Sequence, residues 1–427
     1  MKTIDLQAKN IYFIGIGGVS MSGLAHILHS MGYNIYGSDR QQSSQTSALE
    51  AIGATINYGH NASNITTNID TIVYTAAIKQ DNPEYAAAKN LGIPMLTRAE
   101  LLGKIIATYK NSICIAGTHG KTTTTAMLSH LLLEQNLDPT ISIGAFYQKI
   151  NSNFRLGTSE YFIVESCEYS DSFLQFHPSV GVILNMEFDH PDHFSDLAHT
   201  QKSFATFASN VKDILIINED IKDWQKIASA TKAKVITFKE SNYDQSTLAN
   251  ILGNHNKQNA VAALTVLTAL GIATPPNPYA TYSNPHRRLE TKGTTANGAL
   301  VIDDYAHHPT EIKETLHAIR QKFPDKNIIT VFQPHTFTRT KGLLKDFATS
   351  FGDTDTLILL DIFAAREKDE IIHTKDLLAL IKGIETHYFP SFEACENFLI
   401  NLLSADDLLI TMGASNVNLV GENLLKL

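Results

Sequence analysis

A loop from Gly117 to Thr123, with the sequence GTHGKTT, has the residue types that bind a polyphosphate. The apolar run Ile113 to Ala116 precedes it and an apolar-faced helix is predicted after it, which is the setting of a P-loop. Backbone N–H groups of such a loop surround phosphate oxygens; Lys121 is placed to reach the β and γ oxygens of a nucleotide, and Thr122 to face Mg²⁺. The usual first glycine is replaced by Ile115. We still predict a nucleotide site, because Gly-Lys-Thr-Thr between a strand and a helix is a strong pattern.

Acidic and histidine side chains follow two more predicted strands of the same segment. Glu165 ends one apolar run, and the sequence from Asn185 to His190 follows another. These groups are expected beside the loop, where a carboxylate is a natural Mg²⁺ ligand. His190 is a less usual ligand for a hard cation, with a structural histidine as the alternative, and no third soft ligand near His193 supports zinc. Three further acidic residues are interpreted as groups behind the ligands or as surface residues: Glu168, Glu187 and Asp189.

A second glycine-rich turn, Gly15 to Gly23, follows the apolar run Asn10 to Ile14. Glycines here let the backbone approach a pyrophosphate at a helix N-terminus. Asp39 lies at the end of the next predicted strand, where a ribose-binding carboxylate sits in dinucleotide-binding folds. The dinucleotide pattern fails at its third glycine, where Ser20 stands. A dinucleotide ligand and a plain tight turn therefore both stay open.

Polar loops in the C-terminal third each follow a predicted strand and precede a predicted helix: Asp303 to Thr310, Gln333 to Thr340 and Asp361 to Arg366. In a parallel sheet their His, Arg, Tyr and Asp side chains converge at one edge, where a substrate is gripped. Two shorter segments are less decisive. The amides of Gly253 to Ala260 either serve a ligand or cap a helix. The pair Arg287-Arg288 either neutralises a transferring phosphate or is a solvated linker charge.

Strand, loop and helix patterns alternate along the chain, so an α/β fold with parallel, doubly wound sheets is predicted. We expect three domains, with residues 1–108 Rossmann-like, 109–276 P-loop ATPase-like and 277–427 Rossmann-like. The apolar stretch Ala260 to Ala273 is predicted to be a buried helix, because crossing a bilayer takes about 20 residues. The stretch Asn218 to Ser246 is mostly polar and poorly patterned.

Composition excludes several classes of protein. Of 427 residues, 43% are hydrophobic and 18% charged, which is typical of several packed cores and not of a disordered chain. The net charge of −9 argues against nucleic acid or an anionic membrane as the main partner. Three cysteines, Cys114, Cys167 and Cys395, form no C-x-x-C pair and suit a reducing compartment. With no apolar leader near the N-terminus, we expect a cytoplasmic protein without membrane insertion.

In this order, the motifs resemble those of the Mur ligase family over almost the whole chain. Five segments carry the resemblance: 15–23 (GIGGVSMSG), 116–123 (AGTHGKTT), 255–260 (HNKQNA), 287–290 (RRLE) and 303–311 (DDYAHHPTE). Each alone is common, whereas the combination is specific. The resemblance implies an ATP-dependent carboxylate–amine ligase of peptidoglycan precursor synthesis. It would use Mg²⁺ and join L-alanine to UDP-N-acetylmuramate through an acyl phosphate.

The resemblance also implies a role for individual residues. The first domain would bind UDP-N-acetylmuramate through Gly15, Gly17, Gly18, Ser20, Asp39 and Thr75. The ATP-binding residues would be Gly117, Thr118, His119, Gly120, Lys121, Thr122, Thr123, His255, Asn256, Asn259 and Arg288. The metal ligands would be Thr122, Glu165 and His190. The residues facing the amino acid would be Tyr305, His307, His335 and Arg339. The catalytic residues would be Lys121, His190 and Arg288.

Two alternatives and three departures qualify this reading. A ligase that attaches a preformed peptide to the same nucleotide shares most motifs, and a nicotinamide-dependent oxidoreductase would use the first domain. The P-loop and Ser20 speak against the oxidoreductase.

Cys167 stands where the family has a carboxylate, Ser415-Asn416 replaces Gly-Asp, and the segment between Asn210 and Gly253 lacks strands that the family usually has. We expect a monomer or a homodimer.

Overall fold

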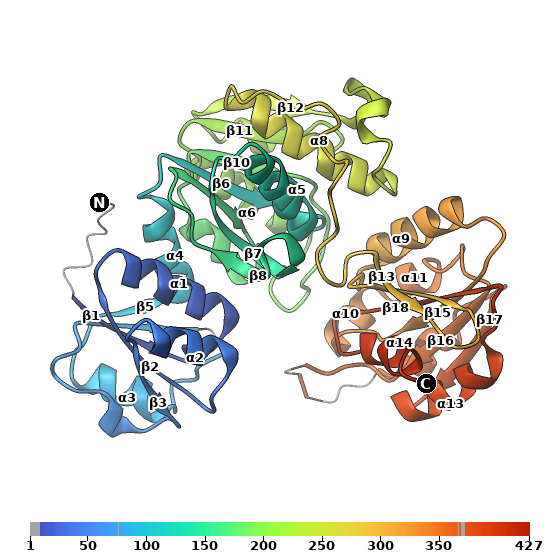
Figure 1. Ribbon diagram of the computed structural model, residues 1–427, viewed down its shortest axis with the longest axis horizontal. Helices are drawn as coiled ribbons and strands as arrows, with labels where there is room; N and C mark the ends of the chain where they lie inside the picture. Colours follow the sequence, from blue (N-terminus) through green and yellow to red (C-terminus); the bar gives the residue numbers. More distant parts are fainter. Residues whose placement is uncertain (1–8, 76, 366, 369–371) are drawn as a thin grey trace.

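The computed structural model describes residues 9–75, 77–365, 367–368 and 372–427. Arg366, at the end of the third predicted loop, lies outside these residues. Three α/β units follow one another along the chain, each built on its own sheet. In Figure 1 the first unit (blue) lies to the left, the central unit (green and yellow) at the top and the last unit (orange and red) to the right. The predicted fold class is confirmed.

The first sheet has five parallel strands in the order β3-β2-β1-β4-β5. Its strands are β1 (Asn10–Ile14), β2 (Asn34–Asp39), β3 (Thr55–Tyr58), β4 (Thr71–Tyr74) and β5 (Met95–Thr97). Its helices are α1 (Val19–Ser30), α2 (Ser44–Ala51), α3 (Pro83–Asn90) and α4 (Arg98–Ile106). Because the strands are parallel, the glycine-rich turn after β1 and Thr75 after β4 lie at the same edge of the sheet.

The central sheet has seven strands in the order β12-β11-β10-β6-β9-β7-β8, and only β8 is antiparallel to its neighbour. Its strands are β6 (Asn111–Ala116), β7 (Thr140–Tyr147), β8 (Ser152–Arg155), β9 (Tyr161–Glu165), β10 (Val180–Ile183), β11 (Ile214–Asn218) and β12 (Lys234–Phe238). Its helices are α5 (Lys121–Glu134), α6 (Leu197–Asn210), α7 (Trp224–Ala228) and α8 (Asn254–Ala269). Helix α8 is buried from Asn259 to Leu267 and lies beside α5, which confirms the predicted buried helix.

The last sheet has six strands in the order β13-β14-β18-β15-β16-β17, with only β13 antiparallel. Its strands are β13 (Glu290–Thr294), β14 (Leu300–Asp304), β15 (Asn327–Phe332), β16 (Thr356–Leu360), β17 (Glu385–Phe389) and β18 (Asp407–Met412). Its helices are α9 (Pro309–Lys322), α10 (Phe337–Gly342), α11 (Leu344–Ala348), α12 (Thr374–Leu378), α13 (Phe392–Leu402) and α14 (Asn418–Leu424). The loops after β14 and β15 therefore share one sheet edge, as predicted.

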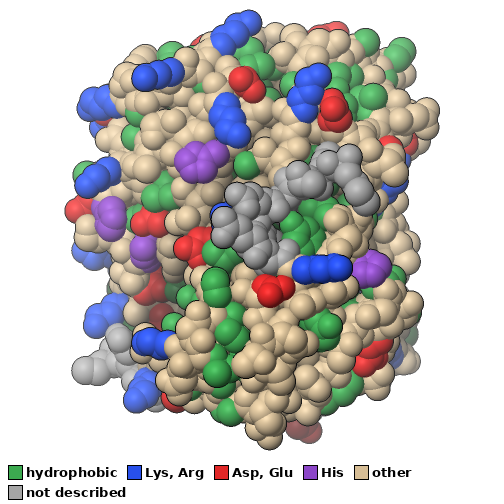
Figure 2. Space-filling view, turned by 90° about the vertical axis from the view of Figure 1, so that its left-hand side faces the viewer, with side chains coloured by type: hydrophobic (Ala, Val, Ile, Leu, Met, Phe, Trp, Pro, Cys, Tyr) green, Lys and Arg blue, Asp and Glu red, His purple; other side chains and the backbone are tan. Residues whose placement is uncertain are grey.

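The molecular surface mixes charges of both signs. On the face drawn in Figure 2, Lys and Arg side chains are scattered among acidic ones over the part that is coloured. None of the described helices is both long and apolar enough to cross a membrane.

A buried carboxylate that sequence patterns do not reveal organises the first unit. Glu84 on α3 is 0% exposed and meets four side chains from different segments. Tyr12 donates to it at 2.8 Å, Ser38 at 2.6 Å and Asn64 at 2.7 Å, and His60 Nδ1 lies 2.8 Å away. The side chain thereby ties α3 to β1, β2 and the loop after β3.

Replacing Glu84 by alanine is expected to destabilise the first unit by about 3 kcal/mol or more, because several buried groups lose their acceptor together. Glu84→Gln, which keeps the shape and one acceptor oxygen, should cost less. Urea unfolding followed by circular dichroism measures both, with the earliest transition assigned to the weakened unit. Equal midpoints for wild type and Glu84→Ala would contradict the role of this network.

Candidate active site

The P-loop is held against helix α8 by close packing at Gly120. This residue caps α5 with φ of +80°, a left-handed conformation that favours glycine. A Cβ atom there would lie 2.3 Å from Asn259 Oδ1. The 255–260 motif therefore lies directly against the loop. Its amides do not cap α8, which begins at Asn254 after the N-cap residue Gly253 and has no side-chain cap, so the capping alternative is wrong.

Lys121 occupies the centre of the loop as a largely covered, paired cation whose side chain is 13% exposed. Its Nζ donates to the carbonyls of Gly117 at 2.5 Å and Thr118 at 2.9 Å, and lies 2.8 Å from Glu168 Oε2. Burial alone lowers the pKa of Lys121, but the nearby Glu168 carboxylate outweighs burial and raises it. The ammonium group therefore stays charged at the position where phosphates bind in a P-loop.

Thr122, Glu165 and Arg288 meet beside Lys121. Thr122 Oγ1 donates to Glu165 Oε1 at 2.9 Å and accepts from Arg288 Nη2 at 3.2 Å. Gly144 N donates to the other carboxylate oxygen at 2.6 Å. A hydroxyl and a carboxylate are the hard oxygen ligands that Mg²⁺ prefers, so these two predicted ligands fit the ion. Thr122 and Glu165, which were predicted to bind the metal, are thus connected to Arg288, which was predicted to be catalytic.

His190 belongs to a neighbouring group that is joined to Lys121 through Glu168. Its Nε2 lies 3.6 Å from Glu168 Oε1, and its backbone has φ of +54°. Such strained backbone in a non-glycine residue is found most often at functional sites. Glu168 is only 2% exposed and Asp189 5% exposed. Of the two interpretations left open for these carboxylates, groups behind the ligands or surface residues, the surface one is wrong, because each is buried and pairs with a cation.

Asp189 holds Arg339 across the junction between the central and last units. Arg339 Nε donates to Oδ1 at 2.8 Å and Nη2 to Oδ2 at 3.2 Å, and both side chains are buried. Burial raises the pKa of Asp189, but the guanidinium of Arg339 outweighs burial and holds it well below its usual range. Arg339 Nη1 also lies 3.1 Å from His335 Nδ1.

The other residues predicted to face the amino acid adjoin Arg339. The rings of His307 and His335 are 6.0 Å apart, and those of Tyr305 and His307 are 5.4 Å apart. Burial lowers the pKa of His307 to about 3 and that of His335 to about 4. Both imidazoles are therefore neutral at physiological pH, weak as bases, and able to accept a hydrogen bond.

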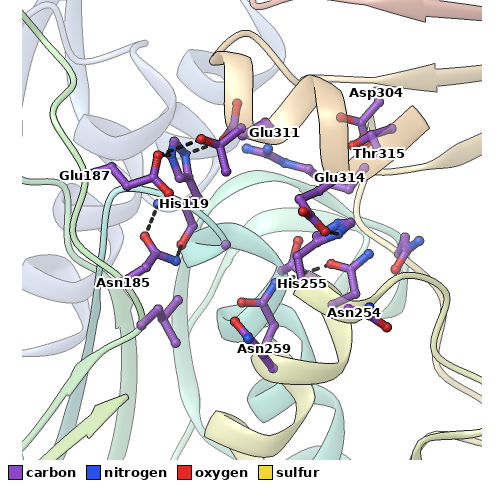
Figure 3. A pocket seen from close by; sticks show the side chains of 18 of the residues that line it. His119, Asn185, Glu187, Asn254, His255, Asn259, Asp304, Glu311, Glu314 and Thr315 are labelled. Carbon is purple, nitrogen blue, oxygen red and sulfur yellow. Dashed lines mark hydrogen bonds and ion pairs between the residues drawn. The ribbon is translucent and has the colours of Figure 1, made fainter. Parts of the chain in front are cut away.

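A cavity of about 340 Å³ lies between the central and last units (Figure 3). It is lined by His119, Gly120, Thr123, His255, Asn256, Asn259 and Arg288, among others. Burial lowers the pKa of His255 to about 4. Seven of the residues predicted to bind ATP are therefore together in one cavity that opens beside the P-loop.

A second cavity, of about 260 Å³, lies between the first and central units. Its lining includes Ser20, Arg98, Gly144, Glu165 and Cys167. Arg98 donates to Ser20 at 3.2 Å. Glu165 lines this cavity while its partner Thr122 contacts Arg288, which lines the first cavity. The contacts Glu165–Thr122 and Thr122–Arg288 thus connect a residue of one cavity to a residue of the other.

The glycine-rich turn of the first unit is braced by Asp39, whose Oδ2 accepts from Gly17 N at 2.8 Å. A Cβ atom on Gly17 would lie 2.8 Å from the same oxygen. Gly15 N donates to Ser38 O at 2.9 Å, and Thr75 Oγ1 accepts from Ala77 N at 3.2 Å. The structure places Asp39 against the turn, where it orders the backbone.

Arg287 is not a solvated linker charge. It donates to Asp303 Oδ2 at 2.8 Å and to the carbonyls of Gly413 at 2.8 Å and Ser415 at 2.5 Å. The loop that departs from the family pattern at Ser415 therefore anchors the arginine next to Arg288. Arg288, the next residue, donates to Thr122 Oγ1 at 3.2 Å.

Family models match the three units in turn: "Mur ligase family, catalytic domain" matches residues 10–110, "Mur ligase middle domain" 115–261 and "Mur ligase, glutamate ligase domain" 287–415. The UDP-N-acetylmuramate–L-alanine ligase of Agathobacter rectalis is 47% identical, with 100% of both chains covered. The chain belongs to the Mur ligase family. The ligase of the same name from Clostridium novyi is 44% identical and covers 98% of this chain and 97% of its own.

The fold of this Mur ligase is also that of a solved relative. The UDP-N-acetylmuramate-alanine ligase of Thermotoga maritima superposes with a TM-score of 0.77, at 23% identity and with 98% of each chain covered. At that identity the likeness supports the three-domain fold. The observations that bear on the substrate and on the roles of single residues are the geometry of this chain and the more similar sequences.

Three residues that take part in this Mur ligase site were not predicted as site residues from the sequence: Arg98, Glu168 and Glu311. Glu311 at the start of α9 reaches His119 Nδ1 at 3.1 Å, across the junction between two units. Arg98 and Ser20 are likewise far apart in the chain. Glu168 offered one signal, since it closely follows Glu165 beyond a strand end. The other two meet their partners only through the packing of separate segments.

Glu165→Gln is expected to raise the Mg²⁺ concentration needed for half-maximal activity by about 10-fold or more, because one charged ligand is lost while its shape is kept. Initial rates measured over a Mg²⁺ series test this. Glu160→Gln is the matched control, since Glu160 precedes the same strand and its side chain is 63% exposed. An unchanged Mg²⁺ dependence of the Glu165 variant would make this residue structural.

Proposed function

We propose that this Mur ligase joins L-alanine to UDP-N-acetylmuramate with hydrolysis of ATP to ADP and phosphate. The observation that carries the proposal is the chain of contacts from Glu165 through Thr122 to Arg288, which connects the linings of the two cavities next to Lys121. A nucleotide in the first cavity and a sugar carboxylate in the second would bring the two reacting groups to the same point. Names of the full-length relatives support the amino acid and the nucleotide sugar.

In the first step, a carboxylate oxygen of UDP-N-acetylmuramate attacks the γ-phosphorus, and the bond to the β–γ bridging oxygen breaks. Lys121 and Arg288 are cations placed to stabilise negative charge on the moving phosphoryl group. Mg²⁺ held by Thr122 and Glu165 would neutralise phosphate charge. The products of this step are ADP and an acyl phosphate.

In the second step, the amine of L-alanine attacks the acyl carbon and phosphate leaves with the bridging oxygen. Arg339 is suited to hold the amino-acid carboxylate, since a guanidinium forms two parallel hydrogen bonds with such a group. Asp189, which already pairs with Arg339, would hold the guanidinium in position while Arg339 binds that carboxylate. Neutral His307 and His335 lie close enough to Arg339 to line the same site and accept hydrogen bonds from the amine, whose proton leaves to solvent or with the phosphate.

Each domain has a role in this scheme. Residues 1–108 would bind the nucleotide sugar, 109–276 ATP, and 277–427 both ATP and the amino acid. Closure of the three domains would exclude water that hydrolyses an acyl phosphate. Such an enzyme would work in the cytoplasm, as a monomer or a homodimer, on precursors of peptidoglycan.

Product mass after incubation with ATP and UDP-N-acetylmuramate tests the proposal. We expect an L-alanine adduct, with glycine and L-serine as poor but detectable substrates, because one methyl group gives only about 1–3 kcal/mol of discrimination. A parallel incubation offers a preformed tripeptide in place of L-alanine. A tripeptide adduct without an alanine adduct would promote the peptide-attaching ligase. NADH oxidation without phosphate release would promote the oxidoreductase.

A further inference from the structure

Three side chains converge at the junction of the central and last units: His119, Glu187 and His308. None of them is a metal ligand in the proposed ligase reaction. His119 lies in the P-loop, Glu187 in the loop after β10, and His308 at the start of α9. One nitrogen or oxygen atom of each lies within 4.8 Å of the others. Among the residues that the structure describes, no other group of His, Cys, Asp and Glu meets this condition.

The spacing of these atoms is close to that of a zinc site. Four ligands at about 2.0–2.1 Å around a tetrahedral Zn²⁺ lie about 3.3 Å from one another. Glu187 Oε2 lies 3.5 Å from His119 Nε2 and 3.8 Å from His308 Nδ1. The histidine nitrogens lie within 4.8 Å of one another, so the two rings have to move closer together to share one ion.

Supporting contacts aim each of the three side chains at the same point. His119 Nδ1 lies 3.1 Å from Glu311 Oε1, and His308 Nε2 lies 3.4 Å from Phe188 O. Glu187 Oε2 accepts from the Thr310 hydroxyl at 2.6 Å. Metal-binding histidines almost always donate their second N–H to a carboxylate or a carbonyl in this way. His119 Nε2 then faces Glu187. His308 Nδ1 accepts a hydrogen bond from Thr310 N at 3.3 Å, and an ion would take the place of that donor.

His119 Nε2 is the atom that most needs a partner. It is buried and makes no hydrogen bond within the part of the chain that the structure describes, which is rare for a buried polar atom. Burial lowers the pKa of His119, but Glu187 and Glu311 outweigh burial and raise it to about 9. At neutral pH both ring nitrogens therefore carry a proton, and a metal ion binds only by displacing the one on Nε2.

We propose that His119, Glu187 and His308 bind a zinc-type divalent transition-metal ion whose fourth position opens into the nucleotide cavity. Two imidazoles and one carboxylate favour zinc over Mg²⁺ and leave a position for water or a phosphate oxygen. Figure 3 shows His119 between Glu187 and Glu311 at the edge of that cavity. The site is distinct from the oxygen ligands at Thr122 and Glu165.

An ion at this site would join two units of the protein, because it takes two ligands from the central unit and one from the last. We therefore expect Zn²⁺ to raise the temperature at which the two units unfold, since a ligand that binds only the folded arrangement stabilises it. The ion would also contact any phosphate that enters the cavity.

Calorimetric titration of the full chain with Zn²⁺ tests the proposal, after chelator treatment and with Mg²⁺ in excess to occupy hard-ligand sites. The wild type is expected to bind one ion that His308→Asn and Glu187→Gln bind at least about 10-fold more weakly. Asparagine at 308 keeps an N-cap for α9, and glutamine at 187 keeps an acceptor for Thr310. Because the two variants alter different units, a folding defect in one leaves the other informative.

His317→Asn is the matched control, since His317 lies on the same helix α9 and its side chain is 49% exposed. This variant should bind Zn²⁺ as the wild type does. Co²⁺ in place of Zn²⁺ should give the intense visible absorption of a four-coordinate ion in the wild type and lose it in both site variants. Equal Zn²⁺ stoichiometry and affinity in the wild type and the two site variants would overturn the proposal.

Discussion

Lys121→Met is expected to lower ATP-dependent product formation by about 10²-fold or more, because it removes the cation that stabilises the transferring phosphoryl group. The substitution also leaves Glu168, which is 2% exposed, without its cationic partner. An unpaired buried carboxylate costs about 3–5 kcal/mol. Lower thermal stability is therefore expected alongside the catalytic loss.

A double variant separates these two effects. Lys121→Met with Glu168→Gln removes both charges, so much of the lost stability should return while activity stays low. Lys104→Met, on the exposed face of α4, serves as the control and should behave as the wild type. Near-normal turnover by Lys121→Met, together with normal thermal unfolding, would refute the assignment of this lysine to catalysis.

Asp189→Ala is expected to destabilise the protein by about 3–5 kcal/mol, because Arg339 is 4% exposed and would keep its charge without a partner. We also expect the KM for L-alanine to rise more than the KM for ATP, since Asp189 orients the guanidinium proposed to hold the amino acid. Thermal unfolding and separate substrate titrations measure the two effects. Asp192→Asn, at an exposed position in the same loop, is the control.

The stability that the Asp189–Arg339 pair contributes is expected to decrease as the pH falls. The pKa of Asp189 is depressed in the folded protein, so the pair contributes its full stability above the ordinary pKa of an aspartate. That contribution declines as the pH falls toward the lower, folded-state pKa. The difference in stability between wild type and Asp189→Asn should therefore be constant near neutral pH and shrink in acid. A difference that is the same at acid and neutral pH would contradict the pairing.

Buried strands were predictable because their sequences are continuous apolar runs. β1 coincides with the apolar run Asn10–Ile14, and β6 (Asn111–Ala116) contains the run from Ile113 to Ala116. β12 was hidden in the stretch judged poorly patterned, because this edge strand has exposed residues at Lys234 and Val235. A half-exposed edge strand carries little apolar signal, so only its pairing with β11 reveals it.

The site residues that could be predicted from the sequence are those that stand at the end of a strand. Lys121, Thr122 and Glu165 each follow an apolar run, and a parallel sheet brings such ends together. Contacts between units had no such local signal. The pairing of Arg339 with Asp189 and that of His119 with Glu311 join segments about 150 and 192 residues apart, and only the packing of the domains creates them.

Transfer of oxygen from substrate to phosphate is the most direct measurement of the proposed reaction. UDP-N-acetylmuramate labelled with ¹⁸O in its carboxylate is incubated with the enzyme, unlabelled ATP and L-alanine in ordinary water, and the phosphate released is analysed by mass. If the carboxylate attacks the γ-phosphorus at the Lys121 site, each phosphate carries one ¹⁸O from the substrate. Phosphate without label, formed in step with the product, would contradict an acyl phosphate intermediate.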